Sequence, residues 1–246
     1  KVYMETLLDW LEGELKYRKA EAFVFGVSGG VDSAVIAFLL AERFKEQSLG
    51  VMMPSHSHPK DLDDAKLVMD AAGLPYHIVD LTSTHTTLMK AIGTHYGELE
   101  DETKNRVIIG NTSARLRMTT LYTIAQTQNA LVVGTDNAVE WYTGYFTKFG
   151  DGGVDINPLI HLDKDEVYEL AELLGVPDEI IHKPPSAGLW EAQTDEDEMG
   201  TTYKMMNRHL KGLEIPEKDR EVIAYWHNRS HHKRAMPRTP EPYRKS

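Results

Sequence analysis

The chain has 246 residues, a formal net charge of −11 and no cysteine. This length suffices for one α/β domain with a large core, and we expect residues 1–246 to form a single domain. The acidity argues against nucleic acid as a partner, because nucleic acids are normally bound by a basic face. The absence of disulfides is consistent with a cytoplasmic location. The longest apolar stretch, residues 34–41, is too short to cross a bilayer, so we expect no membrane contact.

The first half of the chain alternates helical and strand-like patterns. Leucines at helical spacing in residues 2–17 predict an amphipathic helix, which is a candidate dimer surface. Further helices are predicted over residues 34–44 and 62–72, the latter ending at Gly73. Short apolar runs predict strands at residues 23–27, 49–53, 76–79 and 131–134. This alternation predicts a doubly wound, mostly parallel sheet flanked by helices, with its ligand at the carboxyl ends of the strands.

The segment Ser28-Gly29-Gly30-Val31-Asp32-Ser33 stands between the first predicted strand and the next helix. Its glycines permit close approach of the backbone to an anion, and the N–H groups of a helix start can hold a phosphate. The segment is neither a Walker A loop nor a dinucleotide fingerprint. A carboxylate in an anion-binding loop indicates a divalent cation between Asp32 and a phosphate.

Residues 134–164 are rich in Gly, Asp, Thr and aromatic residues and show little periodicity. In a compact domain, a segment of this length and composition more often has a function than serves only as a connection. A helix follows, because Asp163 and Glu166 have capping-box spacing and Gly175 precedes Pro177. Lys164 lies in its first turn, where a cation opposes the helix dipole. A phosphate partner would explain this placement.

These motifs resemble a known group of enzymes. The string SGGVDS matches the pyrophosphate loop of the ATP pyrophosphatases, which cleave ATP between its α and β phosphates. Residues 134–158, the segment NTSARLRM at 111–118, KPPSAGLW at 183–190 and His232-Lys233-Arg234 resemble the ammonia-dependent NAD synthetases. The resemblance implies an adenine nucleotide alpha hydrolase-like fold, a homodimer, and the substrates ATP, deamido-NAD and ammonia.

The missing cysteines narrow the choice within this group. Sulfur-transferring relatives generally carry sulfur on a cysteine, and glutaminase domains commonly use a cysteine nucleophile. The chain should therefore use free ammonia or receive it from a separate protein. Two alternatives remain open: another amidating ATP pyrophosphatase of the GMP synthetase type, and a non-catalytic nucleotide-binding regulatory module.

The resemblance also implies roles for particular residues. Asp32 and Glu140 would bind Mg²⁺, and Asp32, Lys164 and Asp155 are the candidate catalytic residues. The candidate deamido-NAD contacts are Arg115, Lys148, Asp155, His232 and Lys233. The candidate ATP contacts are Gly26, Val27, Ser28, Gly29, Gly30, Val31, Asp32, Ser33, Thr135, Lys164 and Ser186.

The implied reaction has two steps. The nicotinate carboxylate attacks the α-phosphorus of ATP and releases pyrophosphate, and ammonia then displaces AMP to give NAD. No protein nucleophile is needed, so catalysis should rest on positioning and electrostatics. Gly188 stands where some members of this family carry Asp, and that carboxylate is missing here. His56 and His58 lack a third ligand at metal spacing, and we assign them no role.

Overall fold

The computed structural model describes residues 1–97, 99, 102–183 and 195–243. Its strands are β1 (Ala22–Gly26), β2 (Ser48–Met52), β3 (Tyr76–Ile78) and β4 (Ala130–Val133). Its longer helices are α1 (Val2–Arg18), α2 (Val31–Arg43), α3 (Pro59–Ala72), α4 (Thr82–Tyr96), α5 (Glu102–Thr127), α7 (Lys164–Leu174), α10 (Tyr203–Leu210) and α11 (Glu217–Arg229). The shorter ones are α6 (Ala138–Thr143), α8 (Asp178–Ile181), α9 (Asp195–Met199), η1 (Lys45–Gln47) and η2 (His231–Lys233).

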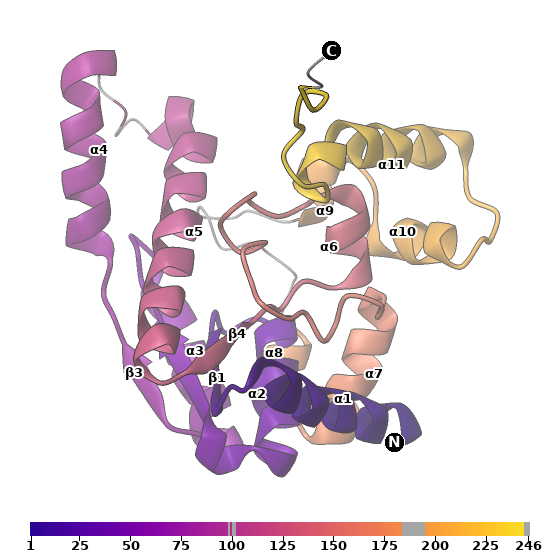
Figure 1. Ribbon diagram of the computed structural model, residues 1–246. Coiled ribbons are helices and arrows are strands. Elements are labelled where there is room, and N and C mark those ends of the chain that lie inside the picture. The colour runs from indigo at the N-terminus through magenta and orange to yellow at the C-terminus, as the bar shows by residue number, and fades with distance from the viewer. Residues whose placement is uncertain (98, 100–101, 184–194, 244–246) are drawn as a thin grey trace.

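The four strands form one parallel sheet in the order β3-β2-β1-β4 (Figure 1). Strand β1 lies at the centre, and the chain leaves it for β2 on one side and later for β4 on the other. The order therefore reverses next to β1, and ligands of such sheets bind at the carboxyl ends beside that reversal. The predicted fold class is confirmed, and each predicted strand agrees with the structure to within one residue at each end.

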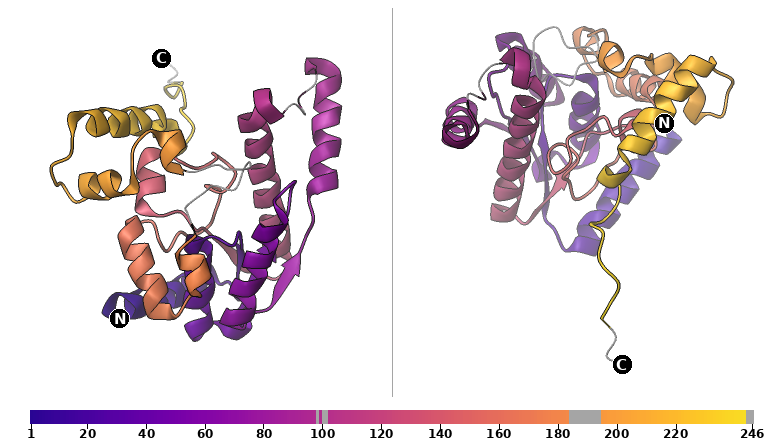
Figure 2. Two further views of the ribbon diagram at one scale, coloured as in Figure 1. Left: turned by 180° about the vertical axis from the view of Figure 1, so that it is seen from behind. Right: turned by 90° about the horizontal axis from the view of Figure 1, so that it is seen from above.

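Helices cover both faces of the sheet (Figure 2). Phe23 and Phe25 of β1 are buried in a large apolar core that also contains residues of α1, α2, α3, α7 and α8. Val24, between them, points to the opposite face and packs with residues of α5. This alternation follows from the two-residue period of a strand. The all-apolar sequence of β1 is thus explained by burial on both faces.

A smaller helical layer lies beyond the carboxyl ends of the strands. Helices α6, α9, α10 and α11 share an apolar cluster that includes Val139, Met206 and Ile223. In Figure 1 this layer and α5 flank the segment that follows β4. The layer therefore brings residues from the end of the chain towards the loop after β1.

Two expectations about local structure were wrong. Helix α2 begins at Val31, not at residue 34, so Asp32 and Ser33 lie in its first turn rather than in a loop. A carboxylate is favoured there by the helix dipole, and Gly30 serves as the N-cap. Residues 138–143, within the segment expected to be irregular, form helix α6. None of the helices in the described part of the chain is long and apolar enough to cross a membrane.

Candidate active site

The loop after β1 is built for close approach of an anion. Gly29 has φ +80°, and a Cβ there would lie 2.8 Å from Cβ of Asp64, so only glycine fits. The hydroxyl groups of Ser28 and Ser33 lie 3.1 Å apart, and the Gly30 N–H donates to Ser28 Oγ. These bonds close the loop over the start of α2, where helix N–H groups lack intrahelical partners. The predicted phosphate loop therefore has a fitting geometry.

Asp32, in the first turn of α2, contacts two other segments of the chain. Its Oδ2 accepts a bond of 2.5 Å from Nζ of Lys164, and its Oδ1 accepts one of 3.0 Å from Nδ2 of Asn137. Lys164 is 2% exposed, and its ammonium lies 5.1 Å from the ring centroid of Tyr203. Burial acts to lower the pKa of Lys164, but the carboxylates of Asp32 and Glu140 outweigh it and the pKa is raised. Lys164 is therefore a fixed positive charge beside the loop.

Glu140, the second predicted metal ligand, is held at the start of α6. Its Oε2 accepts from the N–H of Asn137, whose side chain in turn accepts from the Glu140 N–H. This reciprocal arrangement is a complete capping box. Burial and the nearby Asp32 raise the pKa of Glu140 well above its ordinary value. The two predicted metal ligands thus lie close enough to repel one another.

The donor set of this site fits Mg²⁺. Asp136 is 4% exposed, and its Oδ2 is a buried oxygen with no hydrogen-bond partner in the described structure. Burial, followed by the charges of Asp151, Glu140 and Asp32, raises its pKa well above the ordinary value. No three His, Cys, Asp or Glu side chains form a complete metal cage among the described residues. Mg²⁺ normally binds one or two carboxylates together with substrate phosphates, which is what Asp32 and Glu140 offer.

Asp155 lies along the free edge of β4. Its Oδ2 accepts 2.8 Å from the N–H of Val132, and its Oδ1 accepts 3.3 Å from the hydroxyl of Tyr122 on α5. Burial, together with Asp155, raises the pKa of Tyr122 to about 12. Both carboxylate oxygens therefore have partners that hold residues 154–156 against β4. The predicted catalytic role of Asp155 stays a prediction.

The predicted dinucleotide contacts Arg115, Lys148, His232 and Lys233 form one connected group. Arg115 Nε donates to the carbonyl of Lys148, and Lys148 Nζ donates to the carbonyl of His232 at 2.9 Å. Lys233 Nζ donates to the carbonyls of Gly144 and Phe146 at 2.6 and 2.5 Å. Burial lowers the pKa of Lys233. These bonds join α5, the segment after α6 and the C-terminal segment.

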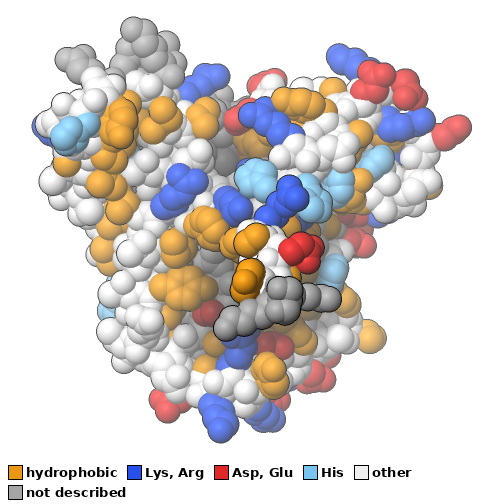
Figure 3. Space-filling view, turned by 45° about the horizontal axis from the view of Figure 1, so that its top comes forward, with side chains coloured by type: hydrophobic (Ala, Val, Ile, Leu, Met, Phe, Trp, Pro, Cys, Tyr) orange, Lys and Arg blue, Asp and Glu red, His pale blue; other side chains and the backbone are white. Residues whose placement is uncertain are grey.

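The positive charges of this group have no ion-pair partner in the part of the chain that the structure describes. In the described ranges, no carboxylate forms an ion pair with Arg115, Lys148 or Lys233. Figure 3 shows Lys, Arg and His side chains gathered in the middle of one face of the molecule. An acidic chain thus carries a local cationic cluster that suits an anionic small molecule.

The remaining assignments have mixed outcomes. Thr135 is the second residue after β4, at the predicted edge of the sheet. Ser186 and Gly188 lie outside the described residues. His58 caps α3 by accepting from the Lys60 N–H, and His56 bonds to Thr86, so both have structural roles.

Asn137 and Asp136 are the site residues that the sequence interpretation missed. The spacing Asn137-x-x-Glu140 is the same kind of capping signal that predicted the helix after Asp163. It could have located α6 and its cap. The contact of Asn137 with Asp32 joins residues 105 positions apart, and no local pattern predicts it.

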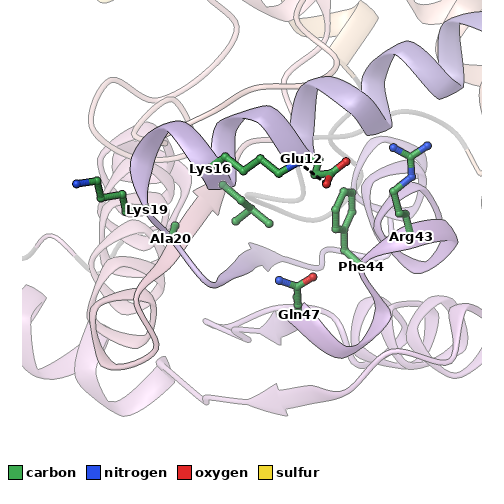
Figure 4. Close-up of a pocket in the computed structure, with 8 residues that line it drawn as sticks. Glu12, Lys16, Lys19, Ala20, Arg43, Phe44 and Gln47 are labelled. Carbon is green, nitrogen blue, oxygen red and sulfur yellow. Dashed lines mark hydrogen bonds and ion pairs between the residues drawn. The ribbon is translucent and has the colours of Figure 1, made fainter.

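A hollow elsewhere on the molecule has no part in this site. Its volume is ≈ 530 Å³, and its lining includes Leu15, Lys16, Arg43 and Phe44 (Figure 4). It borders the ends of α1 and α2 and the residues that precede β1 and β2. It therefore lies at the amino ends of these strands, away from the edge where such sheets bind ligands.

Comparison with known proteins agrees with this geometry. The family model described as NAD synthase matches residues 3–237. A protein of Alkaliphilus metalliredigens named NH(3)-dependent NAD(+) synthetase is 52% identical over 239 residues, covering 96% of this chain and 97% of that protein. One of Alkaliphilus oremlandii with the same name is 48% identical over 240 residues, covering 97% of this chain and 96% of that protein.

Solved structures show the same likeness. The NMN synthetase of Francisella tularensis superposes with a TM-score of 0.91 at 42% identity, covering 98% of both chains. The NH3-dependent NAD synthetase of Campylobacter jejuni superposes with a TM-score of 0.78 at 28% identity, covering 97% of both. The fold is the adenine nucleotide alpha hydrolase-like one of the NAD synthetases. With nearly its whole length matched, the chain belongs to the NAD synthase family.

Proposed function

We propose that this chain is an ammonia-dependent NAD synthetase, a ligase that forms a C–N bond. It joins ammonia to the nicotinate carboxylate of deamido-NAD at the expense of ATP, which leaves as AMP and pyrophosphate. The names of the relatives support this reaction over GMP synthesis. The observation that carries the proposal is the contact of Asp32 with both Lys164 and the Asn137–Glu140 cap, beside the phosphate loop.

In this scheme the phosphates of ATP lie over the loop 28–33. The N–H groups at the start of α2 and the ammonium of Lys164 hold the leaving pyrophosphate, whose negative charge grows during the first step. Asp32 and Glu140 would hold Mg²⁺, which withdraws charge from the phosphates when bound. Lys164 would then contact a phosphate, as its position in the sequence suggested. Its ammonium would either give up its hydrogen bond to Asp32 or donate to Asp32 and the phosphate together.

The dinucleotide would lie against the cationic group. Arg115, Lys148 and Lys233 offer positive charge to its pyrophosphate and its carboxylate, without competing ion pairs in the described structure. The carboxylate oxygen then forms a bond to the α-phosphorus while the bond to pyrophosphate breaks. Ammonia next forms the amide bond, and the C–O bond to AMP breaks. A carboxylate alone is a poor acyl donor at neutral pH, so the adenylation step is required.

A second candidate substrate is nicotinic acid mononucleotide. The high TM-score to the protein named NMN synthetase favours it. This substrate carries the same reacting carboxylate but lacks the adenylate half, so the chemistry at Asp32, Glu140 and Lys164 would be unchanged.

The test supplies Mg-ATP and ammonium with either nucleotide and follows the amide product and pyrophosphate. We expect a higher kcat/KM for the dinucleotide. A higher kcat/KM for the mononucleotide would assign the second candidate, and no ammonium-dependent product from either, with ATP still bound, would contradict both. The homodimer and the cytoplasmic location remain predictions, which sedimentation and cell fractionation can check.

A further inference from the structure

Four of the hydrogen bonds that Asn137 makes at the start of α6 together join two carboxylates. Its Oδ1 accepts from the N–H groups of Val139 and Glu140 at 3.0 and 3.1 Å. Its own N–H donates 3.0 Å to Oε2 of Glu140. Its Nδ2 donates 3.0 Å to Oδ1 of Asp32, which lies 105 residues away. One fully buried side chain therefore connects the first turns of α2 and α6.

These partners fix the orientation of the amide. Two N–H groups face the position of Oδ1, and a carboxylate oxygen faces the position of Nδ2. Rotating the amide by 180° would set an NH₂ group against two N–H donors and an oxygen against a carboxylate. Both arrangements would be repulsive, so only one orientation satisfies the site.

We infer that Asn137 is a positioning residue that sets the separation of the Asp32 and Glu140 carboxylates for the metal. The inference rests on the proposed function, in which these two side chains hold Mg²⁺. Without the Asn137 amide, Asp32 would keep, among the described residues, only its bond to Lys164, and its repulsion by the Glu140 carboxylate would no longer be opposed by the bond to Nδ2. Hydrogen-bonded partners of metal ligands commonly change metal affinity by about 10–100-fold when they are replaced.

Asparagine is the residue type that can both cap α6 and donate a hydrogen bond to Asp32. Ser, Thr, Asp and Asn are all good N-caps, because each has an oxygen that accepts from the first turn. Aspartate would set a like charge against Asp32, and the shorter serine and threonine side chains do not extend to it. Asparagine supplies both the acceptor for α6 and a donor for Asp32.

The test measures metal binding rather than turnover. Mn²⁺, followed by its paramagnetic resonance signal, is titrated into the protein with an ATP analogue that has a methylene bridge between the α and β phosphates. Asn137→Ser keeps an N-cap oxygen but has no amide to donate to Asp32. The matched control is Thr202→Ala, which removes the N-cap of α10, where Thr202 Oγ1 accepts from the Met205 N–H.

We expect Asn137→Ser to raise the Mn²⁺ dissociation constant about tenfold. The Mg²⁺ concentration for half-maximal turnover should rise similarly, with the KM for ammonium unchanged. Thr202→Ala should lower the melting temperature without changing Mn²⁺ affinity. Equal affinity in Asn137→Ser and the wild type, or an equal loss in Thr202→Ala, would overturn the positioning role. Because the Mn²⁺ titration contains neither dinucleotide nor ammonia, its result is independent of whether the chain makes NAD.

Discussion

Nζ of Lys164 lies 2.5 Å from Oδ2 of Asp32, so the first turns of α7 and α2 are joined by an ion pair across 132 residues of sequence. The pair explains why a cation can occupy a helix start, where the helix dipole disfavours it. The Lys164 side chain is 3% exposed and that of Asp32 17%. The same pair places both groups beside the loop after β1, where we propose that the phosphates of ATP bind.

Replacing Asp32 should affect both folding and turnover. Asp32→Ala leaves the Lys164 ammonium buried without its ion-pair partner, and the loss of one member of such a pair costs about 3 kcal/mol. We expect a lower free energy of unfolding in urea and no detectable NAD formation. The effect on folding is expected because Asp32 lies in the first turn of α2 and not, as its sequence context suggested, in a loop.

The double variant Asp32→Ala/Lys164→Met separates the two effects. It removes the uncompensated charge, so much of the stability should return while turnover stays absent. If Asp32→Ala is as stable as the wild type, the ion pair of Asp32 with Lys164 does not stabilise the fold. If Asp32→Ala retains turnover, Asp32 has no role in the reaction.

Glu140→Gln should remove the proposed metal ligand without removing the cap. Glutamine at this position can still accept from the Asn137 N–H, so α6 should be retained. The loss of a carboxylate that holds Mg²⁺ should reduce kcat by at least about 100-fold, measured with saturating Mg-ATP. Turnover within a few-fold of the wild type would contradict the metal role of Glu140.

The same variant should change the pH dependence of stability. Burial and Asp32 raise the pKa of Glu140 above 4.5, so the folded state binds its proton more tightly than the unfolded state. Stability from this group is fully present below pH 4.5 and is lost as the pH rises through the raised pKa. Without metal, Glu140→Gln should therefore be more stable than the wild type at pH 8. Urea titrations of both proteins in EDTA at several pH values measure this difference in stability. The same pH dependence of the free energy of unfolding in Glu140→Gln and in the wild type would contradict the prediction.

The fold was largely predictable because it depends on local patterns. Short apolar runs such as residues 23–27 and 131–134 predicted strands, and the capping box of Asp163 and Glu166 predicted the start of α7. Helix α6 was missed because six residues are too few to show a helical period. The α2 boundary was missed because Gly30 and Asp32 were interpreted as loop residues.

The site was only partly predictable, for a physical reason. Motif resemblance named Asp32, Glu140 and Lys164, but their contacts depend on tertiary structure. The partner of Lys164 was expected to be a phosphate, and the structure supplies Asp32. The bond from Asn137 to Asp32 likewise joins distant segments. Such contacts exist only after the sheet brings the ends of β1 and β4 together.

Two substitutions of Asp155 should separate structure from chemistry. Asp155→Ala leaves the Val132 N–H unpaired and should lower the free energy of unfolding by about 2 kcal/mol. Asp155→Asn keeps an acceptor for this N–H and should unfold like the wild type. Because the asparagine carries no charge to offer the substrate, its kcat/KM for the dinucleotide should fall about tenfold. Full activity of the asparagine variant would limit Asp155 to a structural role.

Lys233→Met should weaken binding of the dinucleotide more than it slows the reaction. It removes a positive charge and the donor to the carbonyls of Gly144 and Phe146. We expect the KM for the dinucleotide to rise about tenfold while the KM for ATP stays within twofold. Lys16→Met, at an exposed lysine that pairs only with Glu12 within the described structure, is the matched control and should change neither. Equal KM values in both variants would place Lys233 outside the dinucleotide site.

The path of one oxygen atom tests the proposed reaction most directly. The dinucleotide is prepared with ¹⁸O in its nicotinate carboxylate and incubated with the protein, Mg-ATP and ammonium, and AMP is analysed by mass spectrometry. If the carboxylate attacks the α-phosphorus, one labelled oxygen is transferred to each AMP as NAD forms. AMP without label, or NAD formation without AMP, would contradict the account.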